Sequence, residues 1–167
     1  IERRVGVVYA GRMTYRNIKN HYVLIGFNEL SINMIRELYD ECPSARILLM
    51  SGIEAATVRH RIQSALPIEI ERQVLVYFGN IESIEELQRL NIESAIEVYV
   101  LGDEERYGRD AKNIAIVHLV SALRGKCSDG KMMPVYVQFD SIPSYSNIQK
   151  MNLPPEVFCI CLLYTSD

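Results

Sequence analysis

Five short apolar runs, separated by stretches with helical periodicity, constrain the fold of this chain most strongly. The runs are nearly continuous in apolar residues instead of alternating with polar ones, which is typical of strands buried on both faces of a sheet. Strands that alternate with helices predict a parallel sheet with right-handed crossovers. The expected strands cover residues 22–25, 46–50, 73–78, 98–101 and 134–139.

Helical patterns fill the gaps between these runs, over residues 30–39, 54–65, 83–90 and 110–124. Ser83 and Glu86 have the spacing of a capping box, and Asn91 is placed to end the third helix. His118 follows the apolar period of the fourth helix and is expected in the core. The predicted fold class is α/β: a Rossmann-like, doubly wound sheet, mainly parallel, with helices on both faces.

Composition narrows the class of protein. A length of 167 residues suits about one domain. The net charge of −3, without a concentrated basic face, argues against a nucleic-acid partner. No apolar run approaches the roughly 20 residues needed to cross a bilayer. The four cysteines form no CxxC pair, so we expect reduced thiols and no structural zinc site.

The fold predicts where a ligand would bind, because doubly wound sheets bind ligands outside the carboxyl ends of their strands, where the strand order reverses. Four strand ends carry a glycine at or within one residue of the turn, which suggests that the backbone approaches something closely. The candidate ligand-binding residues are Gly26, Phe27, Asn28, Glu29, Leu30, Ser51, Gly79, Asn80, Gly102 and Asp103.

The first turn is a substituted dinucleotide fingerprint. Of the three glycines in GxGxxG only Gly26 survives, and Asn28 and Ser31 replace the other two. Glu29 adds a negative charge beside the anion site. The second strand ends in Ser51 and Gly52, without the acid that would hold a ribose. NAD(H) is therefore disfavoured, while a nucleotide site and an empty or repurposed turn both stay open.

Other candidate residues have two readings each. The acidic run after the fourth strand is either a site for a divalent cation or a solvated loop; it consists of Asp103, Glu104 and Glu105. Asn80 is either a ligand contact or a turn residue. The three histidines share no spacing typical of metal ligands. We find no Tyr-x-x-x-Lys pair, nucleophile elbow or GxxxxGK loop, so the sequence predicts no catalytic residues and no enzyme.

Four further segments form a recognisable pattern between about His21 and Leu153: GFNELSINMIREL, VYFGNIESIEELQRLNIESAIEVYVLGDE, DAKNIAIVHLVSALRG and VYVQFDSIPSYSNIQKMNL. Together these segments resemble the regulator-of-potassium-conductance (RCK) domain, also called the Trk N-terminal domain. The substituted first turn is more similar to the ligand-gated potassium-channel branch of the family than to the NAD-binding transporter branch. In place of the Gly-Asp that usually follows the third strand, this chain has Gly79 and Asn80.

The resemblance implies a cytoplasmic regulatory domain that couples ligand binding to the gating of a potassium channel or uptake system, as a homodimer or ring assembled through helix faces. It implies that residues 1–20 are a linker from an upstream membrane pore, residues 21–153 are the regulatory domain, and residues 154–167 are a truncated tail or the start of a following segment. Calcium regulation is not implied. The calcium-gated branch needs carboxylates on the fifth strand, where this chain has Gln138 and Asp140, and only Asp140 supplies one. The alternatives are an NAD(P)-dependent oxidoreductase domain and a structural assembly domain with an empty, degenerate nucleotide site.

Overall fold

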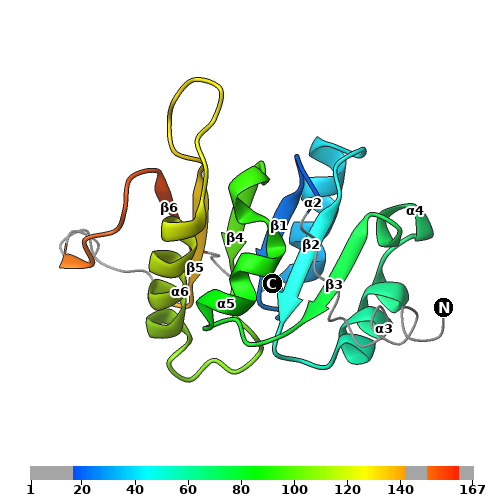
Figure 1. Cartoon of the computed structure of the whole chain (residues 1–167). Coiled ribbons are helices and arrows are strands. Elements are labelled where there is room, and N and C mark those ends of the chain that lie inside the picture. Colours follow the sequence, from blue (N-terminus) through cyan, green and yellow to red (C-terminus); the bar gives the residue numbers. More distant parts are fainter. Residues whose placement is uncertain (1–16, 142–149, 162–167) are drawn as a thin grey trace.

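The structure, a computed structural model, describes residues 17–141 and 150–161, so most of the expected linker lies outside the described residues. A six-stranded, entirely parallel sheet forms the centre of the molecule, in the order β3-β2-β1-β4-β5-β6 (Figure 1). The strands are β1 (Tyr22–Ile25), β2 (Ile47–Ser51), β3 (Val74–Phe78), β4 (Glu97–Val100), β5 (Val135–Phe139) and β6 (Val157–Cys161). The predicted α/β doubly wound fold is confirmed.

Helices connect the strands and cover both faces of the sheet (Figure 1). They are α2 (Ser31–Glu41), α3 (Ala55–Ala65), α4 (Ile68–Glu71), α5 (Ile84–Leu87) and α6 (Arg109–Leu123). The expected helix over residues 83–90 is shorter than predicted, since α5 continues as a 3₁₀ turn from Gln88 to Leu90. Both of its predicted ends are confirmed: Ser83 accepts a hydrogen bond from the Glu86 amide, and Asn91 adopts the left-handed conformation with φ of 49°.

The hydrophobic core has two parts, one on each face of the sheet. Val23 and Ile25 of β1 pack with the apolar sides of α5 and α6, whereas Tyr22 and Leu24 pack with those of α2 and α3. Because successive side chains of a strand point to opposite faces, a strand covered on both sides must be apolar at every position. This is the physical basis of the continuous apolar runs in the sequence.

Two histidines differ in burial, and one of them differs from its predicted placement. His118 is exposed, so the expectation that it lies in the core is wrong. The buried face of α6 instead runs through Asn113, Ile116, Val117 and Val120, and His118 falls outside that stripe. His21 is the buried histidine, and its Nε2 lies 3.0 Å from the carbonyl oxygen of Leu90. Burial lowers the pKa of His21 more than this hydrogen bond raises it.

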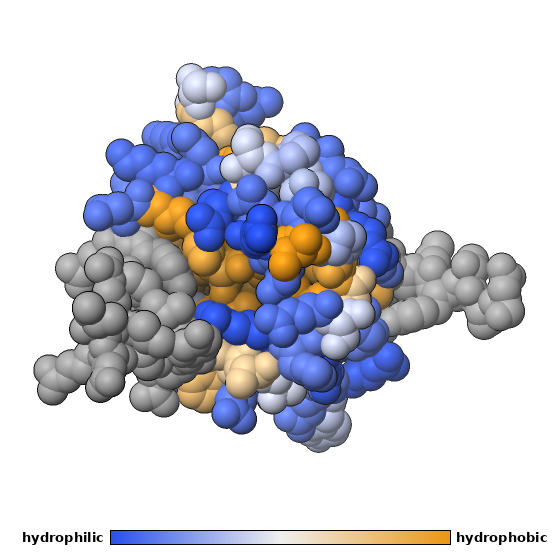
Figure 2. All heavy atoms as spheres, turned by 90° about the vertical axis from the view of Figure 1, so that its right-hand side faces the viewer, coloured by the Kyte–Doolittle hydropathy of each residue, from blue (hydrophilic) through white to orange (hydrophobic). Residues whose placement is uncertain are grey.

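The two edges of the sheet differ. On one side β6 extends the sheet into residues that the sequence assigns to a tail, and Phe158 packs on Tyr136, which stacks on Tyr99 with ring centroids 4.9 Å apart. On the other side β3 is the edge strand. Figure 2 faces this edge and shows hydrophobic side chains gathered in the middle of the face, surrounded by hydrophilic ones. Within the described residues, no helix has both the length and the apolar character to span a membrane.

Candidate functional site

The strand order reverses between β1 and β4, and the turns that follow these two strands touch each other. Gly26 has φ of +98° and Gly102 has φ of +82°, which are backbone conformations that other residues rarely adopt. A Cβ on Gly26 would lie 2.3 Å from the carbonyl carbon of Gly102. The close approach expected from these glycines is therefore, at this point, the approach of one turn to the other.

Asn28 holds the first turn against the end of β4. Its side chain is buried, and its amide nitrogen donates to the carbonyl oxygens of Leu101, at 3.2 Å, and Gly102, at 2.9 Å. Its Oδ1 accepts from the Leu30 amide at 2.9 Å, and its own backbone N–H donates to Ser31 Oγ at 2.9 Å. Asn28 and Ser31, which replace two fingerprint glycines, thus provide internal partners for the turn and for the start of α2.

Asp103 reaches back from the end of β4 to the turns after β1 and β2. Its Oδ1 accepts from the Phe27 amide at 2.9 Å and from the Ser51 hydroxyl at 2.6 Å. Its Oδ2 accepts from the Gly52 amide at 3.0 Å. The Asp103 carboxylate therefore joins two other predicted site residues, Phe27 and Ser51, that are far from it in the sequence.

Arg109, the first residue of α6, is a buried cation that the sequence analysis did not select. Its Nε donates to Asp140 Oδ2 at 3.0 Å, a second nitrogen bonds Asp140 Oδ1, and Nη1 donates to the carbonyl oxygen of Asp103 at 3.1 Å. Glu29 lies 3.6 Å from Arg109 and 2.8 Å from Arg106. Burial opposes the charge, but Asp140 and then Glu29 outweigh it, so the pKa of Arg109 is raised. The negative charge of Glu29 is thus compensated by two arginines.

The acidic residues after β4 do not converge on one point. Asp103 faces the turns, Glu104 forms an ion pair with Arg61, and Glu105 is exposed. Across the part of the chain that the structure describes, no three His, Cys, Asp or Glu side chains are grouped so as to hold a metal ion. Of the two readings of this run, the solvated loop fits Glu104 and Glu105, while Asp103 has a structural role.

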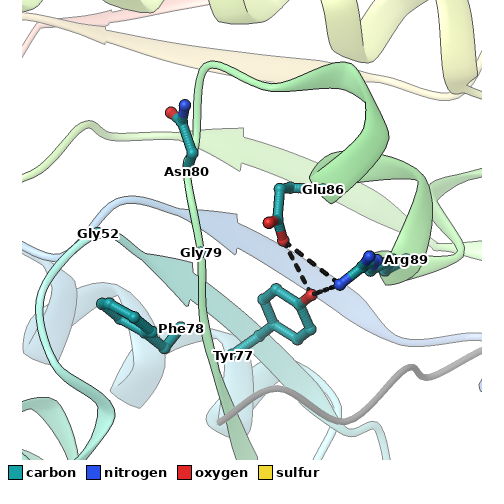
Figure 3. A pocket seen from close by; sticks show the side chains of 7 residues that line it. All are labelled: Gly52, Tyr77, Phe78, Gly79, Asn80, Glu86 and Arg89. Atoms are coloured by element: carbon teal, nitrogen blue, oxygen red, sulfur yellow. Dashed lines mark hydrogen bonds and ion pairs between the residues drawn. The ribbon is translucent and has the colours of Figure 1, made fainter.

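A hollow of about 570 Å³ lies beside the end of β3 (Figure 3). Tyr77 and Phe78 point to opposite sides of the strand, and the Tyr77 hydroxyl lies 2.9 Å from Glu86 Oε2 and 3.0 Å from Arg89 Nη1. Burial is the main cause of the raised pKa of Tyr77, so this phenol stays protonated. The full lining consists of Gly52, Tyr77, Phe78, Gly79, Asn80, Glu86 and Arg89.

A smaller hollow of about 160 Å³ adjoins the first, because Gly52 and Asn80 line both. Asn113 of α6 reaches it, donating from its amide nitrogen to Leu101 and Gln138 carbonyl oxygens at 3.1 and 3.0 Å. Its Oδ1 is buried and has no hydrogen-bond partner among the described residues. Together the two hollows form a crevice along the carboxyl ends of the strands, as the fold predicts.

Eight of the ten predicted site residues fall into three groups, and Glu29 and Leu30 lie outside them. Phe27, Ser51 and Asp103 are hydrogen-bonded together, and Gly26, Asn28 and Gly102 join the two turns. Gly79 and Asn80 line the larger hollow, whereas Glu29 faces the arginines and Leu30 begins the helix. A direct contact of any of them with a ligand stays a prediction. Sequence reasoning missed Arg109, Tyr77, Glu86 and Arg89, although an arginine opening an apolar helix after an acidic loop was a usable signal.

Similar structures share this architecture. The GsuK channel bound to NAD matches with a TM-score of 0.61 at 14% identity, over 95% of this chain and 24% of that one. The GsuK RCK domain matches with the same TM-score and identity, over 94% of this chain and 29% of that one. The TrkA-N domain of the inner membrane protein YbaL from Escherichia coli matches with a TM-score of 0.54 at 16% identity, over 86% of this chain and 89% of that one.

Comparison by sequence finds no match, in contrast to comparison by structure. No protein-family model matches the sequence, and no curated protein is similar enough in sequence to match. The chain spans about a quarter of the length of the GsuK channel chain, so the match covers one part of that protein. The resemblance to RCK and Trk N-terminal domains is confirmed at the level of the fold, with GsuK among the similar structures.

Proposed function

We propose that the domain is a regulatory ligand-binding domain of a potassium channel or potassium-uptake system. The observation that supports this most directly is the crevice along the carboxyl ends of the strands, whose smaller hollow reaches the β4 turn beside the strand-order reversal, in a fold similar to that of the GsuK RCK domain and of a TrkA-N domain. Ligands of doubly wound sheets bind at this position. The residues proposed to contact the ligand are those that line the crevice, above all Gly52, Gly79 and Asn80.

The mechanism we propose is a shift in population between two arrangements of the turns. Arg109 starts α6 and at the same time holds the β4 turn, Asp140 after β5 and Glu29 after β1. A ligand that displaces the β4 turn would therefore also move the beginning of α6. Helix movement of this kind can change how two copies pack, and so link binding to gating.

The proposed context follows from the same fold. We propose a homodimer or higher ring through helix faces, joined by residues 1–20 to an upstream pore and lying on the cytoplasmic side of the cell membrane. In this role the domain catalyses no reaction. The ligand is not NAD(H) in our proposal, because the first turn lacks two fingerprint glycines and Ser51 and Gly52 replace the ribose acid.

Thermal-shift and light-scattering measurements test this proposal. Adenine nucleotides, NAD and divalent cations are added to the chain, in its longest available form, in potassium-containing buffer. A regulatory domain is expected to dimerise or form a ring, and one ligand should raise the melting temperature, since binding to the folded state at 100 times Kd adds about 2.7 kcal/mol. A strictly monomeric chain that no ligand stabilises would contradict the proposal.

A second candidate is a structural assembly domain whose nucleotide site is no longer used. It is favoured by one observation: the Phe27, Asn28 and Leu30 amides of the first turn already have internal acceptors in Asp103, Ser31 and Asn28. This candidate predicts an assembled ring whose stability and size do not respond to any ligand of the panel. Assembly together with a ligand response favours the regulatory domain instead.

A further inference from the structure

We propose that Asp103 is a selectivity residue, whose carboxylate occupies the anion-binding position of the β1 turn and excludes phosphorylated ligands there. In dinucleotide-binding folds the amides of this turn receive a pyrophosphate. Here the Phe27 amide, at 2.9 Å, the Gly52 amide, at 3.0 Å, and the Ser51 hydroxyl, at 2.6 Å, all donate to the Asp103 carboxylate. Backbone amides and a hydroxyl are also the groups that cradle phosphate in anion-binding turns.

The donors are unavailable to another anion as long as Asp103 stays in place. Phe27 is 2% exposed and Ser51 is fully buried. Gly52 lies so close that a Cβ there would be 3.1 Å from Asp103 Oδ2. The amides of Asn28 and Leu30, which continue the turn, donate to Ser31 Oγ and Asn28 Oδ1. A phosphate could gain these hydrogen bonds only by replacing the carboxylate.

Charge strengthens the exclusion. Among the described residues, the Asp103 carboxylate accepts hydrogen bonds from uncharged donors and forms no ion pair. The nearest guanidinium contact, from Arg109, goes to the backbone carbonyl of Asp103 and is shared with Asp140. An incoming phosphate would therefore face a carboxylate whose charge is not cancelled by an ion pair among the described residues, in a partly buried setting where Coulomb repulsion is screened less than in open water.

The exclusion of phosphate by Asp103 restricts the class of ligand that the crevice can bind. A ligand of the crevice turns an uncharged or cationic part toward Asp103, which lines the smaller hollow. The hollow beside β3 offers no net positive charge for an acidic part, because Glu86 lines it together with Arg89. This inference deepens the proposed function and rests on it for treating the crevice as a binding site. The test of this inference measures anion binding by the chain alone. The inference can therefore fail while the proposed role in potassium transport stands, and the proposed role can fail while the inference stands.

The test compares inorganic pyrophosphate binding by the unchanged chain and by three variants, measured by isothermal titration calorimetry. Asp103→Ala frees all three donors, and Asp103→Asn removes the charge while keeping the shape. Glu69→Gln is the matched control, because Glu69 is exposed on α4, lines neither hollow and loses the same charge. We expect at least tenfold tighter binding by both Asp103 variants, and binding by Glu69→Gln unchanged from the parent.

Two results would overturn the proposal. One is equal pyrophosphate affinity of the parent and both Asp103 variants. The other is a gain in Glu69→Gln as large as in Asp103→Asn, which would make the effect one of overall charge. If Asp103→Ala does not fold, the Asn variant and the parent suffice: saturable changes of the Phe27 and Gly52 amide resonances on adding pyrophosphate to the parent would refute the exclusion directly.

Discussion

Replacing Gly26 by alanine tests the contact between the β1 and β4 turns. The change has two costs. A residue with a side chain held at φ of +98° loses about 1–2 kcal/mol relative to glycine. In addition, the new Cβ would lie 2.3 Å from the Gly102 carbonyl carbon, so the two turns must separate, and overpacking of this kind costs about 1–3 kcal/mol. We expect Gly26→Ala to lower the free energy of unfolding by about 2–5 kcal/mol.

Gly130→Ala is the matched control, because it isolates the first cost from the second. Gly130 has φ of +84°, and a Cβ there would meet nothing within 4 Å. Its replacement should cost only the conformational part, about 1–2 kcal/mol. Urea unfolding followed by far-UV circular dichroism gives both values by linear extrapolation. Equal losses for the two variants would refute the reasoning that close packing of the turns makes Gly26 necessary.

Three further changes give distinct outcomes. The pKa of His21 is lowered from 6.5 in the folded state, because burial disfavours the charged imidazolium. Neutral His21 therefore contributes its full stability to the fold above pH 6.5, and this contribution is lost as the pH falls below that value, since the unfolded chain then binds the proton more readily. The free energy of unfolding, measured by urea titration between pH 7 and pH 5, should therefore fall less steeply for His21→Asn than for the parent, by up to about 1.4 kcal/mol per pH unit; parallel curves would contradict this. Arg109→Met removes the bonds to Asp140, whose carboxylate is partly exposed, and to the Asp103 carbonyl, and should cost about 1.5 kcal/mol in the same assay, with Arg109→Lys recovering only part of it; full recovery by lysine would exclude a need for the two-pronged contact. Asn28→Asp turns a buried carboxylate toward the carbonyl oxygen of Leu101 and should cost about 3 kcal/mol at pH 7 and less at pH 4, where the acid is protonated; an equal loss at both pH values would argue against this orientation.

The strands could be predicted because each core strand is covered on both faces, so its apolar character is continuous. The bounds predicted for the first five strands agree with the structure within one residue. The short helix α4 was not predicted as an element, and β6 was not among the five expected strands of the sheet. The four residues of α4 are too few to show a helical period, and β6 follows β5 without a helical pattern of regular length between them.

The site was only partly predictable. Glycine-containing turns located the crevice, since turn chemistry is local in the sequence. The role of Asp103 was not predictable, because Asp103, Glu104 and Glu105 are chemically alike in the sequence. Only the strand order, which places β4 next to β1 and brings Asp103 to the Phe27 amide, distinguishes them. Likewise, the partners of Arg109 come from the ends of three different strands.

The bonds made by Asp103 also determine when the crevice can form during folding. They join residues that are 76, 52 and 51 positions apart, and Asn28 reaches Leu101 across 73 positions. Such distant contacts are slow to form, because a long loop must close before any of them is made. During synthesis, which exposes the N-terminal part first, β1 to β3 can emerge and pair without a finished crevice. The crevice is completed only after β4 and its turn have left the ribosome, so a chain interrupted just before Asp103 contains all of the first four strands but lacks the carboxylate that accepts from the Phe27 amide.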